Sequence, residues 1–117
     1  GTEPSPENPK KDSRLIEALK DYLNSHYQEA LTLSKIAETF SVNPNYLCER
    51  FKQQTGEHFV TYLTRLRIEQ AKLLLEDVTV RAYEVGFRVG YDDPTYFSKV
   101  FKKVVGLTPT EYRQNLP

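Results

Sequence analysis

Apolar residues recur every three or four positions along most of the chain, which is the spacing of amphipathic α-helices. Runs of residues that favour β-strands are short, and none alternates cleanly between apolar and polar positions. The pattern therefore predicts an all-α protein of about seven helices. The expected helices cover residues 13–27, 33–40, 44–54, 59–75, 80–88 and 94–104, with a last short helix from Thr108-Pro109 onward.

Residues that are typical of helix starts and helix ends lie at the boundaries of two of these expected helices. Pro44 follows Asn43, and Pro94 follows Asp93; each pair is typical of an N-cap residue and the first position of a helix. Gly56, after the first of these helices, is a good left-handed C-cap, and Gly106 ends the second. Each of the two helices is thus preceded by a tight turn and a shorter helix.

One motif occurs twice in the chain, with an offset of 49 residues before the turn and 50 after it. The second copy therefore has one extra residue in its turn. The equivalent pairs include Ile36 and Val85, Ala37 and Gly86, Phe40 and Val89, Leu47 and Phe97, Phe51 and Phe101, and Lys52 and Lys102. Each copy predicts a helix-turn-helix, a shape that fits a DNA major groove, so two copies predict a protein that binds two grooves.

The repeat also predicts the domain organisation. We expect a first helix-turn-helix subdomain at 13–58 (motif about 33–54), a linker helix at 59–77 and a second subdomain at 78–117 (motif about 80–104). Residues 1–12 hold three of the seven prolines and no large apolar residue. That composition predicts a disordered linker or a remnant of protein production, with the natural protein continuing upstream.

The charge balance neither demands nor excludes a nucleic-acid partner. The net charge is zero, whereas nucleic-acid-binding domains are usually basic. Residues 1–43 carry five basic and seven acidic side chains, and residues 44–117 carry eleven and nine, so the excess of positive charge lies in the second part. We therefore expect a moderate contribution of counterion release to DNA affinity.

Several other function classes find no support in the sequence. Cys48, the single cysteine, cannot form an internal disulfide, and it shares no metal-ligand spacing with His26 or His58. Neither paired carboxylates, a glycine-rich phosphate loop nor a nucleophile with its base is recognisable, so no enzyme, metal or cofactor is expected. Apolar runs stay well short of the roughly 18 residues that span a membrane, which predicts a cytoplasmic protein without a membrane partner.

The second helix of each motif supplies the candidate DNA contacts, because the outer face of its N-terminal half meets base edges. Its inner face is assigned to Tyr46, Leu47 and Phe51 in the first copy, and to Tyr96, Phe97, Val100 and Phe101 in the second. The outward positions that remain are Asn45, Cys48, Glu49 and Lys52, and then Pro94, Thr95, Ser98, Lys99 and Lys102.

The chemistry of these side chains predicts different roles. Asn45 can bridge adenine through its amide, and Glu49 can accept a hydrogen bond from cytosine N4. Thr95 and Ser98 are adaptable donors or acceptors, so we expect the first helix to discriminate bases more sharply than the second. The lysines of the second helix, Lys99, Lys102 and Lys103, are expected to contact phosphates.

Two candidates keep an alternative role. Cys48 either makes an apolar base contact or is an inert, half-exposed side chain. Arg65 and Arg67, on the expected linker helix, are candidates for phosphate contacts, but Arg67 can instead support the packing of the two lobes.

The residues from Val89 through Lys103 resemble the AraC/XylS family of bacterial transcription regulators, in the version found at the C-terminus of some two-component response regulators. The matching string continues with Gly106, Thr108-Pro109 and Glu111-Tyr112-Arg113. The resemblance covers roughly residues 13–115. It implies two helix-turn-helix lobes joined by a long helix, with base-reading residues at Asn45, Cys48, Glu49, Lys52, Pro94, Thr95, Ser98 and Lys99.

Two positions depart from the family pattern. Gly86 stands where the family usually has alanine, at a cost of up to about 1 kcal/mol in helix stability. Pro94 offers no side-chain hydrogen bond to a base.

Two functional hypotheses follow. The first is sequence-specific binding of double-stranded operator or promoter DNA, with RNA polymerase and an upstream sensing or receiver domain as further partners. The alternative is a helical protein-interaction module that docks RNA polymerase or a receiver domain, which the neutral net charge favours.

Overall fold

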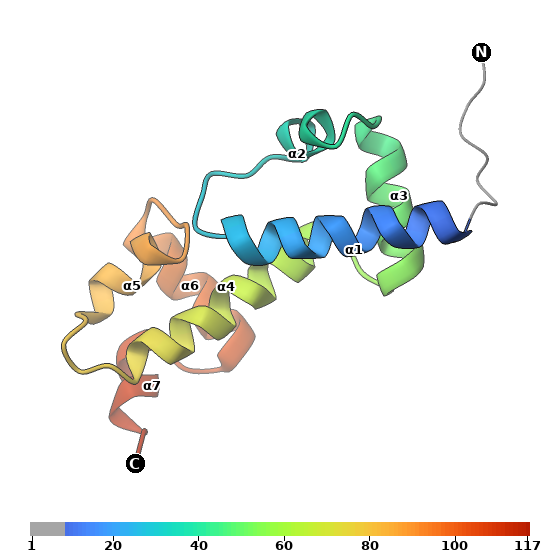
Figure 1. Cartoon of the computed structure of the whole chain (residues 1–117). Coiled ribbons are helices and arrows are strands. Elements are labelled where there is room, and N and C mark those ends of the chain that lie inside the picture. Colours follow the sequence, from blue (N-terminus) through green and yellow to red (C-terminus); the bar gives the residue numbers. More distant parts are fainter. Residues whose placement is uncertain (1–8) are drawn as a thin grey trace. The chain divides into compact units, whose positions relative to one another are not determined.

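The computed structural model describes residues 9–117, and all regular secondary structure in that range is helical. This confirms the all-α prediction. The seven helices of the described range are α1 (Pro9–His26), α2 (Leu33–Thr39), α3 (Pro44–Thr55), α4 (Phe59–Leu75), α5 (Ala82–Arg88), α6 (Pro94–Val105) and α7 (Pro109–Gln114), as shown in Figure 1.

The chain divides into two compact units. The first comprises the described residues through Ser25 together with Thr32–Phe59, and the second comprises His26–Leu31 and Val60–Pro117. Helix α4 therefore belongs to the second unit from Val60 onward. The expected division into two subdomains and a linker helix remains a prediction.

Helix α1 begins earlier than the sequence pattern suggested. It starts at Pro9 rather than Ser13, so residues 9–12 are helical and not part of a disordered linker. Asp12 in its first turn is only 3% exposed, and its carboxylate accepts a hydrogen bond from the Tyr46 hydroxyl of α3. The two residues are 34 positions apart in sequence, so local composition could not indicate this contact. Residues 1–8, the rest of the expected linker, lie outside the described residues.

The core of the first unit comes from one face of each helix, as the apolar spacing predicted. The fully buried side chains of this unit lie on α1, α2 and α3, and are Ile16, Leu19, Leu23, Ile36, Ala37, Leu47 and Phe51. Tyr22 of α1 also packs edge-on against Phe40, with ring centroids 5.6 Å apart.

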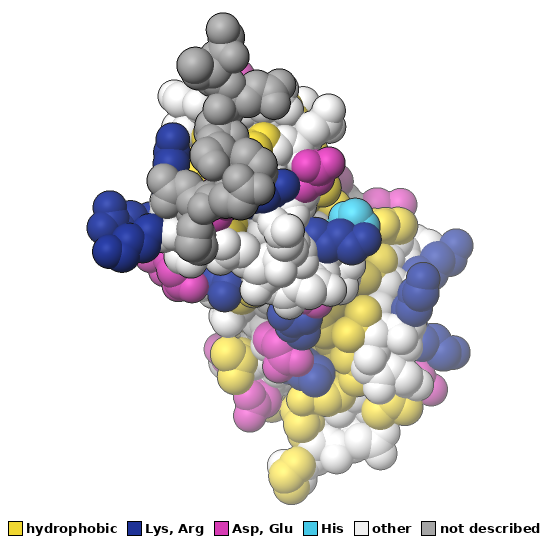
Figure 2. Space-filling view, turned by 90° about the vertical axis from the view of Figure 1, so that its right-hand side faces the viewer, with side chains coloured by type: hydrophobic (Ala, Val, Ile, Leu, Met, Phe, Trp, Pro, Cys, Tyr) yellow, Lys and Arg dark blue, Asp and Glu magenta, His cyan; other side chains and the backbone are white. Residues whose placement is uncertain are grey.

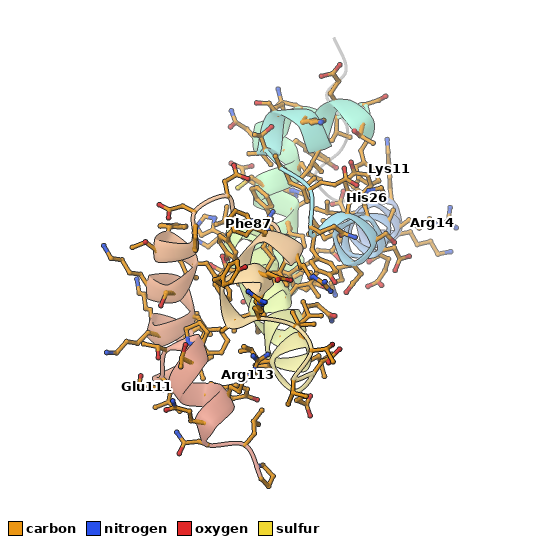
Figure 3. The ribbon with its side chains drawn as sticks, turned by 90° about the vertical axis from the view of Figure 1, so that its left-hand side faces the viewer. Lys11, Arg14, His26, Phe87, Glu111 and Arg113 are labelled. Atoms are coloured by element: carbon orange, nitrogen blue, oxygen red, sulfur yellow. The ribbon has the colours of Figure 1, made fainter. Side chains whose placement is uncertain are left out.

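The core of the second unit joins α4, α5 and α6. Its buried members are Ile68, Ala71, Leu75, Val80, Val85, Val89, Tyr91, Phe97 and Phe101. Arg113 attaches α7 to the end of α4, toward which it reaches in Figure 3: its Nε donates to the Leu75 carbonyl at 2.9 Å and its Nη2 donates to the Val80 carbonyl at 2.6 Å.

The two motifs have the same local structure. Helix α5 repeats α2 with an offset of 49 residues, and α6 repeats α3 with an offset of 50, as the sequence repeat predicted. In both turns the same backbone hydrogen bond forms: Val42 N donates to Ala37 O at 3.0 Å, and Tyr91 N donates to Gly86 O at 2.9 Å. The turns end α2 and α5 and allow the second helix of each motif to start with its own cap.

Glycine and serine occupy the left-handed positions of these motifs. Gly56 and Gly106 are the C-caps of α3 and α6, with φ values of 84° and 93°. Within the turns, Ser41 has φ 56° and its counterpart Gly90 has φ 109°. Only glycine adopts such values without a steric penalty, so Ser41 carries a local strain that Gly90 does not.

Candidate nucleic-acid interface

Helix α3 presents a polar outer face at its N-terminal end. The Asn43 side chain accepts hydrogen bonds from the backbone N–H groups of Asn45 and Tyr46, at 2.8 and 3.3 Å, and thereby fixes the first turn. Leu47 is buried, which turns Asn45 and Glu49 outward, where both are exposed. Lys52, one turn further along, is exposed as well.

Cys48, the fourth candidate on α3, is half-buried. Its Sγ lies 3.9 Å from Nδ1 of His58, which follows the end of the same helix. The thiol therefore has a neighbour within the first unit while part of its surface stays accessible, so both roles proposed for it from sequence remain predictions.

Glu49 has a neighbour that the sequence pattern did not single out. Its carboxylate lies 3.7 Å from Nη2 of Arg50, whose guanidinium also lies 3.9 Å from the Asp12 carboxylate and packs over the Tyr46 ring, 5.3 Å from the centroid. The hydrogen bond to Asp12 raises the pKa of the Tyr46 hydroxyl. A signal was available: Tyr46 and Arg50 are four residues apart and share one helix face.

Helix α6 is built in the same way. Asp93 accepts from the Thr95 N–H at 2.9 Å, and Pro94 occupies the first turn. Phe97 and Phe101 are buried, so the predicted outer residues face solvent: Pro94, Thr95, Lys99, Lys102 and Lys103 are exposed, and Ser98 is half-buried.

Tyr96 departs from the predicted inner face of α6. It is 58% exposed, and its ring packs beside Tyr91 with 5.9 Å between centroids. Tyr91, from the turn, is only 8% exposed and fills the adjacent core position, so the Tyr96 side chain lies at the edge of the core. An exposed aromatic hydroxyl next to Thr95 adds a polar group to the outer face that the sequence pattern did not indicate.

The two arginines of α4 have different surroundings. Arg67 donates from Nε to the Tyr27 carbonyl at 2.7 Å and from Nη2 to the Glu29 carbonyl at 2.8 Å. Its guanidinium also lies over the Tyr91 ring, 5.2 Å from the centroid. These contacts lie within the second unit, and both roles considered for Arg67 from the sequence, a phosphate contact and support of the packing of the two lobes, remain predictions. Arg65 is exposed above Tyr62, at 5.5 Å.

Charge is mixed over the surface. On the face drawn in Figure 2, lysine and arginine side chains stand in separate groups with acidic and hydrophobic side chains among them. This matches the net charge of zero. On that face, attraction to phosphates therefore depends on individually placed basic side chains and not on one broad basic surface.

Residues 9–117 offer neither a metal site nor a membrane span. In that range, no group of three or more histidine, cysteine, aspartate or glutamate side chains is arranged to hold a metal ion. None of the helices α1 to α7 is both long and apolar enough to cross a membrane.

The repeated short helix, tight turn and capped second helix define a domain of the helix-turn-helix DNA-binding class. A family model described as "Helix-turn-helix domain" matches residues 36–115. The "Arabinose operon regulatory protein" of Escherichia coli (strain K12) is 36% identical over 107 residues, which cover 91% of this chain and 36% of that protein. This chain belongs to the AraC-type helix-turn-helix family, which confirms the resemblance seen in the sequence.

Two solved structures agree with this assignment. The C-terminal domain of AraT, a response regulator from Geobacillus stearothermophilus, superposes with a TM-score of 0.85 at 37% identity, over 87% of this chain and 85% of that one. A transcriptional regulator of Chromobacterium violaceum, whose name includes "AraC-type DNA-binding domain-containing proteins", has a TM-score of 0.76 at 26% identity, over 92% and 95% of the two chains. The chain spans about a third of the length of the curated relatives it matches.

Proposed function

We propose that this chain is the sequence-specific, double-stranded DNA-binding domain of a bacterial transcription regulator, and that α3 and α6 enter successive major grooves of one duplex. The observation that carries the proposal is that the two motifs share their helix lengths, the proline and glycine at the ends of the second helix, and the hydrogen bond in the turn. Each motif also leaves the N-terminal outer face of its second helix polar and exposed. That face is the one a helix-turn-helix presents to base edges.

Within this proposal, the two helices contribute differently. On α3, Asn45 reads adenine and Glu49 accepts from cytosine, while Lys52 and Cys48 border the same surface. On α6, Thr95 and Ser98 make adaptable base contacts, and Pro94 contributes shape but no hydrogen bond. The lysines of α6 and the exposed Arg65 of α4 contact phosphates and set the register.

Replacement of one reader and one phosphate contact tests these roles. Asn45→Ala is expected to relax base preference within one half of the site by about 1–3 kcal/mol. Lys102→Ala is expected to weaken binding to all duplexes about equally and to reduce the slope of log affinity against log salt by about 1. If Asn45→Ala leaves every base preference unchanged, the assignment of α3 as a reader is wrong.

The wider protein is proposed from the relatives. A response regulator among them supports a receiver domain upstream of this chain, with the whole protein acting in the cytoplasm on promoter DNA. Arabinose operon regulation by another relative supports a role at transcription initiation and contact with RNA polymerase. No catalytic role is part of this proposal.

A second function, protein docking, is favoured by one observation. Tyr83 and Phe87 on the short helix α5 are 58% and 51% exposed, although both are large apolar side chains. We propose that they contact RNA polymerase or a receiver domain. The variant Phe87→Ser should then retain the DNA affinity and salt dependence of the unaltered chain but lose promoter activation in a purified transcription assay. A loss of DNA affinity as large as the loss of activation would contradict this role.

A further inference from the structure

A buried carboxylate on α1 is connected to the proposed reading face of α3. Asp12 is only 3% exposed, and a buried carboxylate is costly unless it is paired and hydrogen-bonded. Both partners recorded for it lie on α3: the Tyr46 hydroxyl donates to Oδ1 at 2.5 Å, and Nη1 of Arg50 lies 3.9 Å from Oδ2. Asp12 therefore acts on one face of the recognition helix.

Arg50 connects this buried carboxylate with an exposed one. While Nη1 faces Asp12, Nη2 lies 3.7 Å from Oε2 of Glu49, whose side chain is 73% exposed. The Arg50 side chain itself is 13% exposed, and the Tyr46 ring supports its guanidinium. One positive group is thus shared between a fixed carboxylate inside the unit and a carboxylate on the outer face.

We propose that Asp12 and Arg50 are positioning residues that set the base preference of Glu49. This inference rests on the proposed function, in which Glu49 accepts a hydrogen bond from a base. Attraction to Asp12 restrains the guanidinium and leaves the Glu49 carboxylate available to a base amino group. Without the charge of Asp12, Arg50 pairs more fully with Glu49 and competes with the base for the same oxygens.

Asp12→Asn is the direct test, because asparagine keeps an oxygen that accepts from Tyr46 but removes the charge that holds Arg50. The readout is a discrimination ratio: the affinity of the 117-residue chain for its selected duplex, divided by its affinity for a duplex altered at one base pair. The altered base pair is the one whose preference disappears in Glu49→Ala. We expect Asp12→Asn to lower this ratio roughly two- to five-fold, the range of a partly exposed ion pair.

Two further variants separate positioning from support of the fold. In a Glu49→Ala background, Asp12→Asn should leave the ratio unchanged, because no carboxylate remains for Arg50 to occupy. Asp21→Asn, which changes an exposed aspartate of the same helix, is the matched control and should leave the ratio at its original value. If Asp12→Asn does not fold, Arg50→Lys replaces it, because the compact lysine ammonium does not reproduce the planar guanidinium that lies between the two carboxylates; a fall in the ratio is again expected.

The outcomes are distinguishable. A uniform loss of affinity for both duplexes, with the ratio unchanged, shows that Asp12 merely supports the fold and overturns this inference alone. A Glu49→Ala variant that keeps every base preference overturns the role of Glu49 as a reader, and this inference falls with it. Absence of any sequence preference in the unaltered chain overturns the proposed function itself.

Discussion

Phe97 of α6 packs directly onto Gly86 of α5. A Cβ atom added to Gly86 would lie 2.8 Å from both Cγ and Cδ2 of the Phe97 ring, closer than real Cβ contacts. At the equivalent positions of the first motif, Ala37 and Leu47 are both buried. The two motifs therefore fill the same pair of positions differently. The first motif pairs alanine with leucine, whereas the second pairs the smaller glycine with the larger phenylalanine.

This relationship predicts that Gly86→Ala is destabilising, although alanine favours helix by about 1 kcal/mol over glycine. Overpacking against Phe97 should lower the free energy of unfolding by about 1–3 kcal/mol, measured by urea denaturation. Adding Phe97→Leu, which recreates the alanine and leucine pair of the first motif, should recover part of that loss. A more stable Gly86→Ala variant would show that the ring moves aside without cost.

The turns of the two motifs give a second prediction. Gly90 has φ 109°, and an added Cβ would lie 2.6 Å from the Tyr27 carbonyl oxygen, so Gly90→Ala should cost about 2 kcal/mol or more. Ser41→Gly should do the opposite and raise the free energy of unfolding by up to about 1 kcal/mol, because Ser41 has a φ of 56°. Thermal unfolding of both variants measures these effects; a reversed order would contradict the assignment of strain.

Arg67 provides a third prediction, which separates folding from DNA contact. Arg67→Lys keeps the positive charge but cannot donate to both the Tyr27 and Glu29 carbonyls as the guanidinium does. We expect a loss of roughly 2 kcal/mol in unfolding free energy and an unchanged salt dependence of DNA binding. Unchanged stability combined with a shallower salt slope would instead make Arg67 a phosphate contact.

The capping box of α7 predicts a dependence on pH. Thr108 N donates to the Glu111 carboxylate at 2.8 Å, and Glu111 N donates to the Thr108 hydroxyl at 3.2 Å. The hydrogen bond from the Thr108 backbone, followed by that from its side chain, lowers the pKa of Glu111 below its ordinary value. A lowered folded-state pKa stabilises the protein above the unfolded-state pKa, and that stabilisation is lost as the pH falls through the folded-state pKa.

Glu111→Gln should accordingly unfold at a lower temperature than the unaltered chain at pH 7, and the two should converge as the pH is lowered toward 3. Glu76→Gln, which changes an exposed glutamate after α4, is the control. If the unfolding temperatures of Glu111→Gln and the unaltered chain differ by the same amount across this pH range, the carboxylate charge has no part in the cap.

The sequence predicted the parts of the fold that depend on local signals. Apolar spacing, Asn43 and Asp93 as caps, and the prolines after them placed α3 and α6 within a residue of their observed ends. It missed what depends on distant partners. The first turn of α1 contains Asp12, whose hydrogen-bond partner Tyr46 is distant in sequence, and helical spacing alone did not show that Tyr91 would take the core position beside Tyr96.

For the candidate site, too, the sequence predicted what depends on local signals. Outward positions such as Asn45 and Lys99 could be predicted by subtracting the apolar face, because their exposure depends only on helix geometry. Neighbours that are distant in sequence could not. The contact of Arg50 with Asp12 could not be predicted, and Arg67 was left with two possible roles, because these partners lie far away in sequence. The contacts of Arg50 with Glu49 and Tyr46 are local and were missed, although the helical spacing of Tyr46 and Arg50 indicated a shared face.

The central claim is that one chain reads two grooves of one duplex at once, and the spacing of its preferred site tests it most directly. Duplexes selected from a random pool should contain two short conserved blocks centred about 10 base pairs, or one helical turn, apart. Insertion of five base pairs between the blocks should abolish the affinity gained from the second block, since it rotates that block to the opposite side of the helix. A selected site with one block, bound equally tightly with and without the insertion, would contradict the claim.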